Sequence, residues 1–551
     1  MTSLGNRHKG SGVLTRRQLL ATAALGTMGA ACVPLAALSR VQIAQAQAPS
    51  KPGGEVIVAN LARPRSLDPN VWTGYSDNMI MRQIYDPLIW SVKPGVYMPG
   101  LATSWSISKD GKSYTFHLRG DVKFHDGTPF NADAVKFTFD RIVDPKTRSL
   151  QGPAVGPYDH AEVVNESTII IQLKEAFAPL LNNLSGTALS PVSPTAAKRL
   201  GDNYAQSPVG TGPFMFEKWS GNDLYLVRNP DYKWQPRFMN HQGPAYLEHL
   251  VFKTIPEEAT RMIALQRGEV SAVYFPALDQ VARYRTDKNY QVFEFTTPGH
   301  VQSFPMNVKL APTDDLRIRQ AILYGVSRKR IVDLVEYDNA NVAYGPFSST
   351  TPFFDQAVKQ DYPYDKRKAG ELLDSAGWKM GSGGVRRKGS DTLRLQVVMF
   401  DSGPLKQMAE VTQAMLTELG FDVALDVTGY DAFAKRVTDG TYNLSEIVYV
   451  GLDPNVPAFL MYDSSQITGG GQFNRCRIAD PKLDALIAEG RQSTDPRQRQ
   501  HAYFAVQKYV MDNALLLPAW ENSLLTIATS AMIGMSFDLE GRWLFYNVSM
   551  K

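Results

Sequence analysis

The chain is poor in the residues that build crosslinked or reactive sites. Its 551 residues include two cysteines, Cys32 and Cys476, which are too few for a disulfide framework and form no C-x-x-C pair. The eight histidines contain no H-x-x-x-H or H-E-x-x-H spacing, and no G-x-S-x-G segment is present. The commonest patterns of zinc sites and serine hydrolases are therefore excluded. The sequence offers no catalytic residue, no metal ligand set and no cofactor motif.

The remaining candidates for chemistry have structural explanations. Cys476 has no partner at a catalytic spacing, and we expect a buried, inert thiol. His125 lies between a predicted strand and the turn at 126–129, where we expect it to make a structural hydrogen bond. The pair Asp314-Asp315 is expected to cap the helix that follows.

Long apolar runs are also scarce. The run at residues 19–31 is about 13 residues long, which is shorter than the ~20 residues that span a bilayer. Arg16 and Arg17 precede it and Ala46-Gln47-Ala48 follows it, an arrangement typical of an export signal over residues 1–48. The paired arginines resemble the twin-arginine type, so we expect a periplasmic protein cleaved near Ala46 or Ala48. Lipid attachment at Cys32 is a less favoured alternative, because the usual leucine three positions upstream is missing.

The mature chain has no large excess of positive or negative charge. Residues 1–48 carry five basic and no acidic residues, so their removal changes the formal net charge from +4 to −1. A nearly neutral protein has no general attraction for nucleic acid, and we expect no nucleic-acid partner. About 500 residues remain, with 44% hydrophobic and 20% charged residues in the whole chain, which is ordinary for a globular protein of two or three domains.

The mature sequence mixes strand and helix patterns. Asp110-Gly111 predicts a hairpin turn, and Asn131 predicts a helix N-cap. Residues 315–335 predict one long helix, 379–389 an exposed loop, and 393–427 a β-α-β unit. Strands alternate with helices throughout, so the fold class is α/β (mixed α+β).

A series of sequence blocks carries a family resemblance over essentially the whole mature chain. The blocks are Gly53-Gly54, Ser66-Leu67-Asp68-Pro69, 99–105, 110–116, 118–130, 210–214, 228–232, 264–269, 307–309 and 315–321. In this order they resemble the family-5 extracellular solute-binding proteins of ABC importers, the dipeptide, oligopeptide and nickel type. We expect most of these blocks to form turns, caps and core strands. They therefore indicate the fold and say little about the ligand.

The resemblance implies a two-lobed periplasmic-binding-protein fold with three structural domains and a hinge. The chain would cross between the lobes near 296–298 and near 517–519. The implied division is an export signal at 1–48, domain I at 49–92, 205–298 and 517–551, domain II at 93–204, and domain III, the second lobe, at 299–516.

The resemblance also implies where a ligand binds. The residues that map to the cleft are Tyr75, Tyr449, Val450, Gly451, Asp453 and Trp520. Peptide binders of the family carry an aspartate, which receives the peptide amino group, at the position of Val450. Asp453 is expected to brace the turn before Pro454. A solute with a free α-amino group at this point is therefore disfavoured.

The implied function is an extracytoplasmic receptor without enzymatic activity. It would bind a peptide or peptide-like small solute as a monomer and deliver it to a membrane ABC permease. Two alternatives remain: a nickel or metal-chelate binding protein of the same family, and an exported hydrolase.

Overall fold

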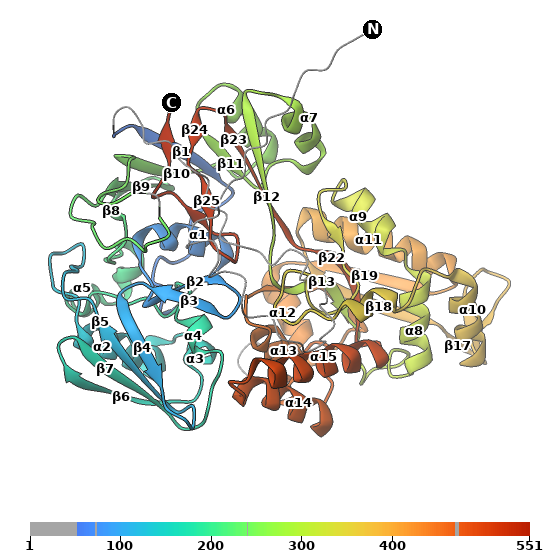
Figure 1. The fold of residues 1–551 in the computed structure, drawn as a ribbon. Helices are drawn as coiled ribbons and strands as arrows, with labels where there is room; N and C mark the ends of the chain where they lie inside the picture. The colour runs from blue at the N-terminus through green and yellow to red at the C-terminus, as the bar shows by residue number, and fades with distance from the viewer. Residues whose placement is uncertain (1–51, 72–73, 240, 469–472) are drawn as a thin grey trace, which may run out of the picture. The chain divides into compact units, whose positions relative to one another are not determined.

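The computed structural model describes residues 52–71, 74–239, 241–468 and 473–551. The predicted export signal, with Arg16, Arg17, Cys32, Ala46 and Ala48, lies outside these ranges. None of the helices within them is both long and apolar enough to cross a bilayer. We call residues 52–296 and 523–551 the first lobe and residues 299–521 the second lobe; Figure 1 shows their elements.

A seven-stranded sheet forms the centre of the first lobe, with strand order β12-β23-β11-β1-β10-β9-β8. Its strands are β1 (Glu55–Asn60), β8 (Phe214–Ser220), β9 (Asp223–Arg228), β10 (His249–Thr254), β11 (Ala272–Tyr274), β12 (Tyr290–Thr296) and β23 (Ser523–Thr529). β1 runs parallel to both of its neighbours, β10 and β11. The C-terminal β23, red in Figure 1, inserts between β11 and β12, so the last part of the chain completes this sheet.

A four-stranded antiparallel sheet, order β4-β5-β7-β6, is the second layer of the first lobe. Its strands are β4 (Ala102–Ile107), β5 (Ser113–Leu118), β6 (Tyr158–Asn165) and β7 (Thr168–Leu173). The hairpin at Asp110-Gly111 is confirmed, because Ile107 pairs with Tyr114 across the turn. Asn131 caps α2 (Ala132–Val143) as predicted, accepting the N–H of Ala134 at 3.1 Å.

The remaining elements of the first lobe are short. The helices are α1 (Tyr75–Ile84), α3 (Gly152–Val155), α4 (Leu180–Asn183), α5 (Pro194–Leu200), α6 (Glu258–Gln266) and α7 (Val281–Thr286). The strands are β2 (Ile89–Lys93), β3 (Val96–Pro99), β24 (Met532–Ile533), β25 (Ser536–Phe537), β26 (Trp543–Leu544) and β27 (Ser549–Met550). One large apolar cluster joins both sheets and α1.

The chain passes between the lobes at two adjacent places. In the first lobe Thr296 of β12 pairs with Ser523 of β23, and in the second Gln302 of β13 (Gly299–Pro305) pairs with Trp520 of β22 (Leu516–Glu521). The second crossing therefore falls at Asn522, just after the expected segment 517–519, which lies within β22. Thr297 ties the crossings together: its N–H and its hydroxyl both donate to the carbonyl of Asn522, at 2.8 and 3.2 Å.

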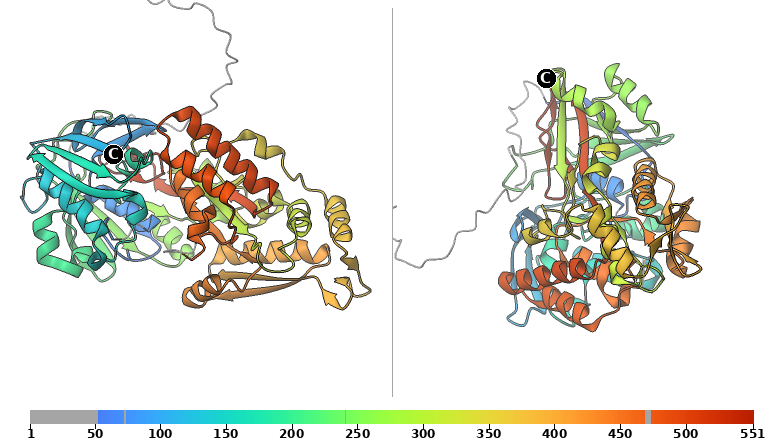
Figure 2. Two further views of the ribbon diagram at one scale, coloured as in Figure 1. Left: turned by 90° about the horizontal axis from the view of Figure 1, so that it is seen from below. Right: turned by 90° about the vertical axis from the view of Figure 1, so that its right-hand side faces the viewer.

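The second lobe contains the predicted β-α-β unit. β18 (Arg394–Phe400) and β19 (Asp422–Thr428) are parallel and joined by α11 (Gly403–Glu418), which confirms the prediction. Two further strands, β14 (Asn341–Val342) and β21 (Ile447–Val450), flank the β13–β22 pair, and β20 (Leu444–Ser445) lies beside β18. The other helices are α8 (Leu316–Gly325), α9 (Arg328–Val335), α10 (Lys366–Ser375), α12 (Tyr430–Asp439), α13 (Asn455–Tyr462), α14 (Pro481–Gln492) and α15 (Pro496–Asp512). α14 and α15, red in Figures 1 and 2, pack side by side.

The long helix predicted at 315–335 is wrong. Asp315 caps α8 as expected, but α8 ends at Gly325 and Val326 is extended. The Ser327 hydroxyl then accepts the N–H of Arg330 and begins α9. A Cβ at Gly325 would lie 2.1 Å from Leu419, so this glycine lets the end of α8 pack closely against the chain that follows α11.

The exposed loop predicted at 379–389 is also wrong. This segment forms a small sheet of β15 (Lys379–Met380), β16 (Arg386–Lys388) and β17 (Asp391–Thr392). Its anchor is Arg386, whose side chain is buried and donates to the Leu419 carbonyl and to the Asp374 carboxylate at 2.8 and 2.6 Å.

Candidate functional site

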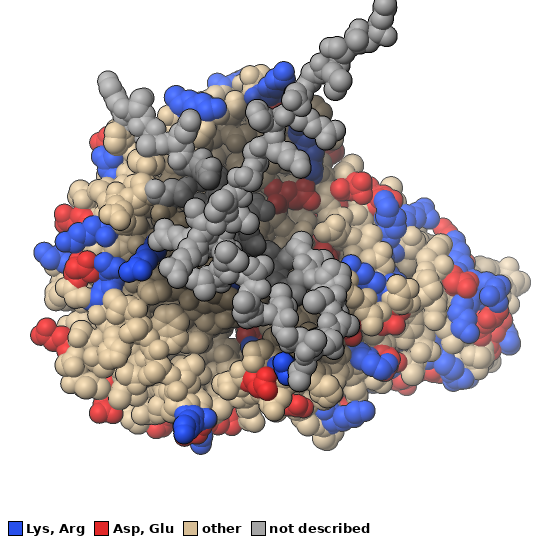
Figure 3. All heavy atoms as spheres, viewed as in Figure 1, with Lys and Arg blue, Asp and Glu red and all other residues tan. Residues whose placement is uncertain are grey.

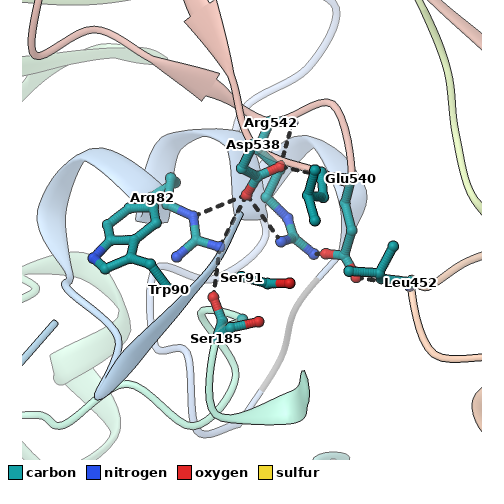
Figure 4. A pocket seen from close by; sticks show the side chains of 10 residues that line it. Arg82, Trp90, Ser91, Ser185, Leu452, Asp538, Glu540 and Arg542 are labelled. Atoms are coloured by element: carbon teal, nitrogen blue, oxygen red, sulfur yellow. Dashed lines mark hydrogen bonds and ion pairs between the residues drawn. The ribbon is translucent and has the colours of Figure 1, made fainter. Parts of the chain in front are cut away.

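A pocket lies beside the C-terminal half of α1, at the junction of several segments that are distant in sequence (Figure 4). Its cavity volume is only about 20 Å³, and the space in front of it is open to solvent. Its lining residues are Arg82, Trp90, Ser91, Ser185, Gly186, Leu452, Asp538, Leu539, Glu540 and Arg542. All but Leu452 belong to the first lobe, so the second lobe reaches the pocket through the segment that follows β21.

A network of charges forms one wall of the pocket. The Oδ2 atom of Asp538 accepts hydrogen bonds from Arg82 Nε and Nη2, at 3.1 and 2.9 Å, and from Arg542 Nη1 at 3.3 Å. Arg542 also pairs with Glu540. Burial lowers the pKa of Arg82 to about 10, with Asp538 opposing the shift and Arg542 adding to it. Arg82 therefore stays protonated at neutral pH although its side chain is only 2% exposed.

The chain between β25 and β26 positions this network. Asp538 Oδ1 accepts the N–H groups of Glu540 and Arg542, at 3.0 and 2.9 Å, which closes a tight turn. Gly541 lies in this turn with φ of +79°, a backbone region that glycine occupies without strain. The same carboxylate thus shapes the turn through one oxygen and holds both guanidinium groups through the other.

Arg82 is held on three sides. Its Nη2 also donates to the Ser185 carbonyl at 2.9 Å, and its guanidinium lies 4.8 Å from the centre of the Trp90 ring. A cation over the face of tryptophan is attracted by the ring quadrupole. The remaining nitrogen, Nη1, is buried and has no hydrogen-bond partner within the described ranges; in Figure 4 it carries no dashed line.

Hydrogen bonds and ring contacts connect the lobes at and near the pocket. Glu540 Oε1 accepts the N–H of Leu452 at 3.1 Å. The N–H of Ala178 donates to the carbonyl of Arg491 at 3.0 Å, and the Arg491 guanidinium lies 5.2 Å from the Phe177 ring. The pocket is therefore bounded by groups whose separation depends on the angle between the lobes.

The segment predicted from the family resemblance adjoins this pocket. Tyr449 and Val450 end β21, Val450 pairs with Gly299, and the N–H of Gly451 donates to the Pro298 carbonyl at 3.1 Å. Gly299 has φ of +122°, and a Cβ there would lie 2.2 Å from the Tyr449 carbonyl oxygen. The segment is thus fixed against the first crossing, one residue before Leu452 enters the pocket.

Asp453 has a partner within the second lobe. Its carboxylate accepts from Arg499 Nη2 at 2.7 Å and from the N–H of Asn455 at 2.8 Å. The second bond is the bracing role expected before Pro454. The side chain of Asp453 is 5% exposed and buried with that of Arg499.

The other predicted ligand contacts lie differently. Trp520 is 4% exposed and belongs to the apolar core of the second lobe. Tyr75 begins α1, but its side chain lies outside the described part of the structure. The roles of these residues, and of Tyr449, Val450, Gly451 and Asp453, as ligand contacts stay predictions.

The charged residues of the pocket are not among those that the sequence predicts. One signal was available: Arg82 interrupts the apolar stretch 79–84, and a cation on the buried face of a helix needs a partner. The spacing of Asp538, Glu540 and Arg542 fits one tight turn, but nothing local places that turn beside α1.

Two structural predictions are confirmed. His125 Nε2 donates to the Gly212 carbonyl at 3.0 Å and Nδ1 accepts the N–H of Gly210, while burial lowers the histidine pKa to about 4. Cys476 is buried, and burial raises the pKa of its thiol to about 12, which makes it unreactive. Among the described residues, no three histidine, cysteine or carboxylate side chains are grouped so that they could hold a metal ion.

The two lobes, the double crossing and the pocket beside it define a periplasmic-binding-protein fold. Residues 96–470 match the model of the bacterial extracellular solute-binding proteins, family 5, and the chain belongs to this family.

Figure 3 shows basic and acidic side chains interspersed on one face, as the nearly neutral mature charge predicts.

Similar proteins have known ligands. The nickel-binding periplasmic protein of Escherichia coli (strain K12) is 29% identical over 82% of this chain and 87% of its own length. The structure of DppA from Helicobacter pylori in complex with the peptide STSA has a TM-score of 0.77 at 26% identity, covering 91% of this chain and 98% of that one. NikA from Brucella suis in complex with Fe(III)-EDTA has a TM-score of 0.81 at 26% identity, covering 90% of this chain and 100% of that one.

Proposed function

We propose that this protein is an extracytoplasmic receptor that binds a peptide or peptide-like small solute and delivers it to a membrane ABC permease. The observation that carries the proposal is the pocket beside the crossings, which the first lobe lines with charged groups and the second lobe reaches through Leu452. A similar protein of known structure, DppA of H. pylori, holds a peptide.

Binding without chemistry is the proposed mode of action. A solute that contacts both lobes stabilises the closed form, because only that form makes both sets of contacts. Closure excludes water, so a few polar groups and an aromatic face suffice for selectivity. We propose that the receptor is a monomer, that it catalyses no reaction, and that the permease recognises its closed form. Turnover of peptides or esters by the purified protein would contradict this and favour the exported hydrolase.

A thermal-shift screen tests the receptor function. The purified mature protein is screened against peptides, glutathione, opines, sugars and metal chelates. A ligand at 100 times its dissociation constant adds about 2.7 kcal/mol of stability, which is readily measured as a rise in Tm. A complete absence of shifts across the panel would refute the proposal.

We propose that Arg16 and Arg17 direct export by the twin-arginine route, with cleavage near Ala46 or Ala48 and a periplasmic destination. Replacing both arginines by lysine should leave uncleaved protein in the cytoplasm. Normal periplasmic accumulation of that variant would refute this route. A mature N-terminus at a lipid-bearing Cys32 would establish a lipoprotein instead.

The three-domain division is also part of the proposal, with domain I at 49–92, 205–298 and the C-terminal segment, domain II at 93–204 and domain III from 299; the boundary expected between 516 and 517 moves to the crossing at Asn522. Rotation about the crossings should lower the radius of gyration when solute is added, which small-angle scattering measures. An unchanged radius with confirmed binding would contradict hinge closure.

A metal chelate is the second candidate solute. It is favoured by the TM-score of 0.81 to a protein that holds Fe(III)-EDTA and by the nickel-binding relative. Because no metal-ligating group of three side chains occurs in the described ranges, the metal would arrive with its own ligands. Metal analysis of protein purified without chelators, followed by calorimetry with Fe(III)-EDTA, distinguishes the two candidates.

A further inference from the structure

A contact between the lobes that is separate from the crossings lies at the C-terminal end of α14. The N–H of Ala178, in the segment that follows β7, donates to the carbonyl of Arg491 at 3.0 Å. The Arg491 guanidinium lies 5.2 Å from the centre of the Phe177 ring in the first lobe and 4.4 Å from that of Phe459 in α13 of the second lobe. Both distances are within the range of a cation–π interaction, so one guanidinium contacts an aromatic ring from each lobe.

The guanidinium of Arg491 has no carboxylate in direct contact. No ion pair of Arg491 occurs in the described part of the chain, where its Nε is also buried without a hydrogen-bond partner. Burial lowers the pKa of Arg491, and the more distant charges of Glu175 in the first lobe and Asp463 in the second oppose this shift. The two aromatic rings therefore take the place of a counter-ion in contact, and such rings attract a cation more strongly where water is excluded.

Phe177 is held in place within the first lobe. It is fully buried, and its carbonyl accepts the hydroxyl of Tyr114 at 3.1 Å. Gly156, with φ of +64°, makes room for the ring, because a Cβ at that position would lie 2.4 Å from it. The Phe177 ring therefore cannot follow Arg491 when the lobes move apart.

The C-terminal end of α14 is held in place within the second lobe. The Gly490 carbonyl accepts a hydrogen bond from Arg499 Nε at 2.9 Å. A Cβ at Gly490 would lie 2.7 Å from the Tyr503 ring, so α14 packs closely against α15. Phe177 and Arg491 thus belong to two separately packed units, and the distance between them changes whenever one lobe rotates relative to the other.

We propose that Phe177, Ala178, Phe459 and Arg491 form a latch that holds the two lobes together without help from a solute. The latch gives a role to the four-stranded layer of the first lobe, because segment 174–178 continues from β7 of that layer. A receptor that is closed for a larger fraction of the time binds a solute that prefers the closed form with higher apparent affinity. The inference goes beyond the proposed receptor function, because it concerns an equilibrium of the chain alone.

The test measures opening of the lobes in the mature protein with no solute added. Spin labels are attached at Lys174→Cys and Lys482→Cys, two exposed positions in different lobes, and double electron–electron resonance gives the distribution of distances between them. Cys476 is buried, so labelling is confined to the introduced cysteines. Exchange of the Ala178 amide hydrogen, followed by mass spectrometry, detects open populations that are too small for the labels.

Arg491→Gln is the variant that breaks the latch, because it keeps the backbone bond to Ala178 and removes the cation. We expect the ratio of open to closed molecules to rise about 3- to 10-fold, the effect of one cation–π contact. The exchange rate at Ala178 should rise by the same factor. Equal distance distributions together with equal exchange rates in wild type and Arg491→Gln would overturn the inference.

Two further variants assign the effect to the contact between ring and cation. Arg491→Lys keeps a cation and should stay close to wild type. Phe177→Leu removes the ring of the first lobe and should open the lobes as Arg491→Gln does. The double variant should open them no further, because both changes break the same contact, and an additive effect would contradict the latch. Should Phe177→Leu fail to fold, Arg491→Gln and Arg491→Lys decide.

Arg63→Gln is the matched control. Arg63 lies 4.3 Å from the centre of the Trp219 ring, but both residues belong to the first lobe. The change removes a cation–π contact that does not join the lobes, so distances and exchange rate should stay as in wild type. An opening as large as that of Arg491→Gln would show that the effect is not specific to the latch and would overturn the inference.

The outcome is independent of the thermal-shift screen, because no solute is added. Opening by Arg491→Gln supports the latch even if no compound in the screen binds. Binding of a compound, with no opening by Arg491→Gln, refutes the latch and leaves the receptor function intact.

Discussion

Arg82 in the first lobe and Arg499 in the second are both buried guanidinium groups near the segment that contains Leu452 and Asp453, yet they are paired differently. Arg499 has the Asp453 carboxylate at 2.7 Å and donates to the Gly490 carbonyl at 2.9 Å. Arg82 shares Asp538 with Arg542. Burial acts to lower both pKa values, but Asp453 raises the pKa of Arg499 above its ordinary value, whereas that of Arg82 falls to about 10.

The difference separates two uses of a buried charge. A cation with its own carboxylate is closed to a ligand and holds the fold in place. Arg82 shares Asp538 with Arg542, and Arg542 also pairs with Glu540, so two cations and two carboxylates form one network. Arg499 therefore belongs to the architecture of the second lobe, and Arg82 to the charged wall of the pocket.

The largest expected effect on stability comes from breaking the ion pair between Asp453 and Arg499. Asp453→Ala leaves Arg499 buried without a counter-charge, and such a change costs about 3–5 kcal/mol of unfolding free energy. Urea unfolding measures it. Asp439→Ala, which removes an exposed i,i+4 partner of Lys435, is the matched control and should cost about 0.3–0.5 kcal/mol. A loss at Asp453 below about 1 kcal/mol would show that the pair is not structural.

Glu336 is a buried acid, in contrast to the two buried arginines. Burial alone raises its pKa from 4.5 to about 7. Between these values the unfolded chain is ionised while the folded protein keeps its proton, so this residue lowers stability as the pH rises from 4.5 to 7. Glu336→Gln should therefore be more stable than wild type by about 1–3 kcal/mol at pH 8 and equally stable at pH 4.5. A difference between the two proteins that does not change with pH in urea unfolding would contradict the assignment.

Val450→Asp adds a carboxylate to the second lobe at a position where the side chain is apolar. The new charge is half-buried in β21, so it should weaken binding of the solute found by screening about tenfold, equivalent to about 1.4 kcal/mol. Val450→Asn is the uncharged control of the same shape and should weaken binding less. The idea fails if calorimetry shows the wild-type protein binding unmodified dipeptides at sub-micromolar affinity while ignoring their N-acetylated forms.

The smallest expected effect on stability concerns the hydrogen bond between Thr297 and Asn522, which joins the two crossings between the lobes. Thr297→Ala removes the hydroxyl bond to the Asn522 carbonyl and keeps the backbone bond, which should cost about 0.5–1.5 kcal/mol. Thr417→Ala removes a hydroxyl bond on the exposed side of α11 and serves as control. Equal urea midpoints for the two variants would mean that the Thr297 hydroxyl does not stabilise the crossing.

The sequence predicted those parts of the fold that depend on residues close together in the chain. The glycine turn at Asp110-Gly111, the Asn131 cap and the β-α-β unit at 393–427 all appear as expected. The helix at 315–335 failed because α8 and α9 present apolar residues to the same core, so the periodicity continues across the break at Val326. The loop at 379–389 failed because Arg386 is buried by partners that are distant in sequence.

The site was harder to predict for the same reason. Family resemblance led to segment 449–453, which adjoins the pocket, but it also selected Trp520, which the core of the second lobe encloses. Arg82 and Asp538 are 456 residues apart, and their contact depends on the C-terminal chain returning to the first lobe. No spacing in the sequence carries that information.

Gly299 has a practical consequence for redesigning specificity. Its missing side chain lets the first crossing touch the backbone of Tyr449, so any larger residue would push β21 and the following segment away from the pocket. Position 299 should therefore be left out of a mutant library, whereas positions 90 and 91 belong to β2 and can be varied without altering a crossing. Selection for new solutes should therefore begin at positions 90 and 91 and leave position 299 unchanged.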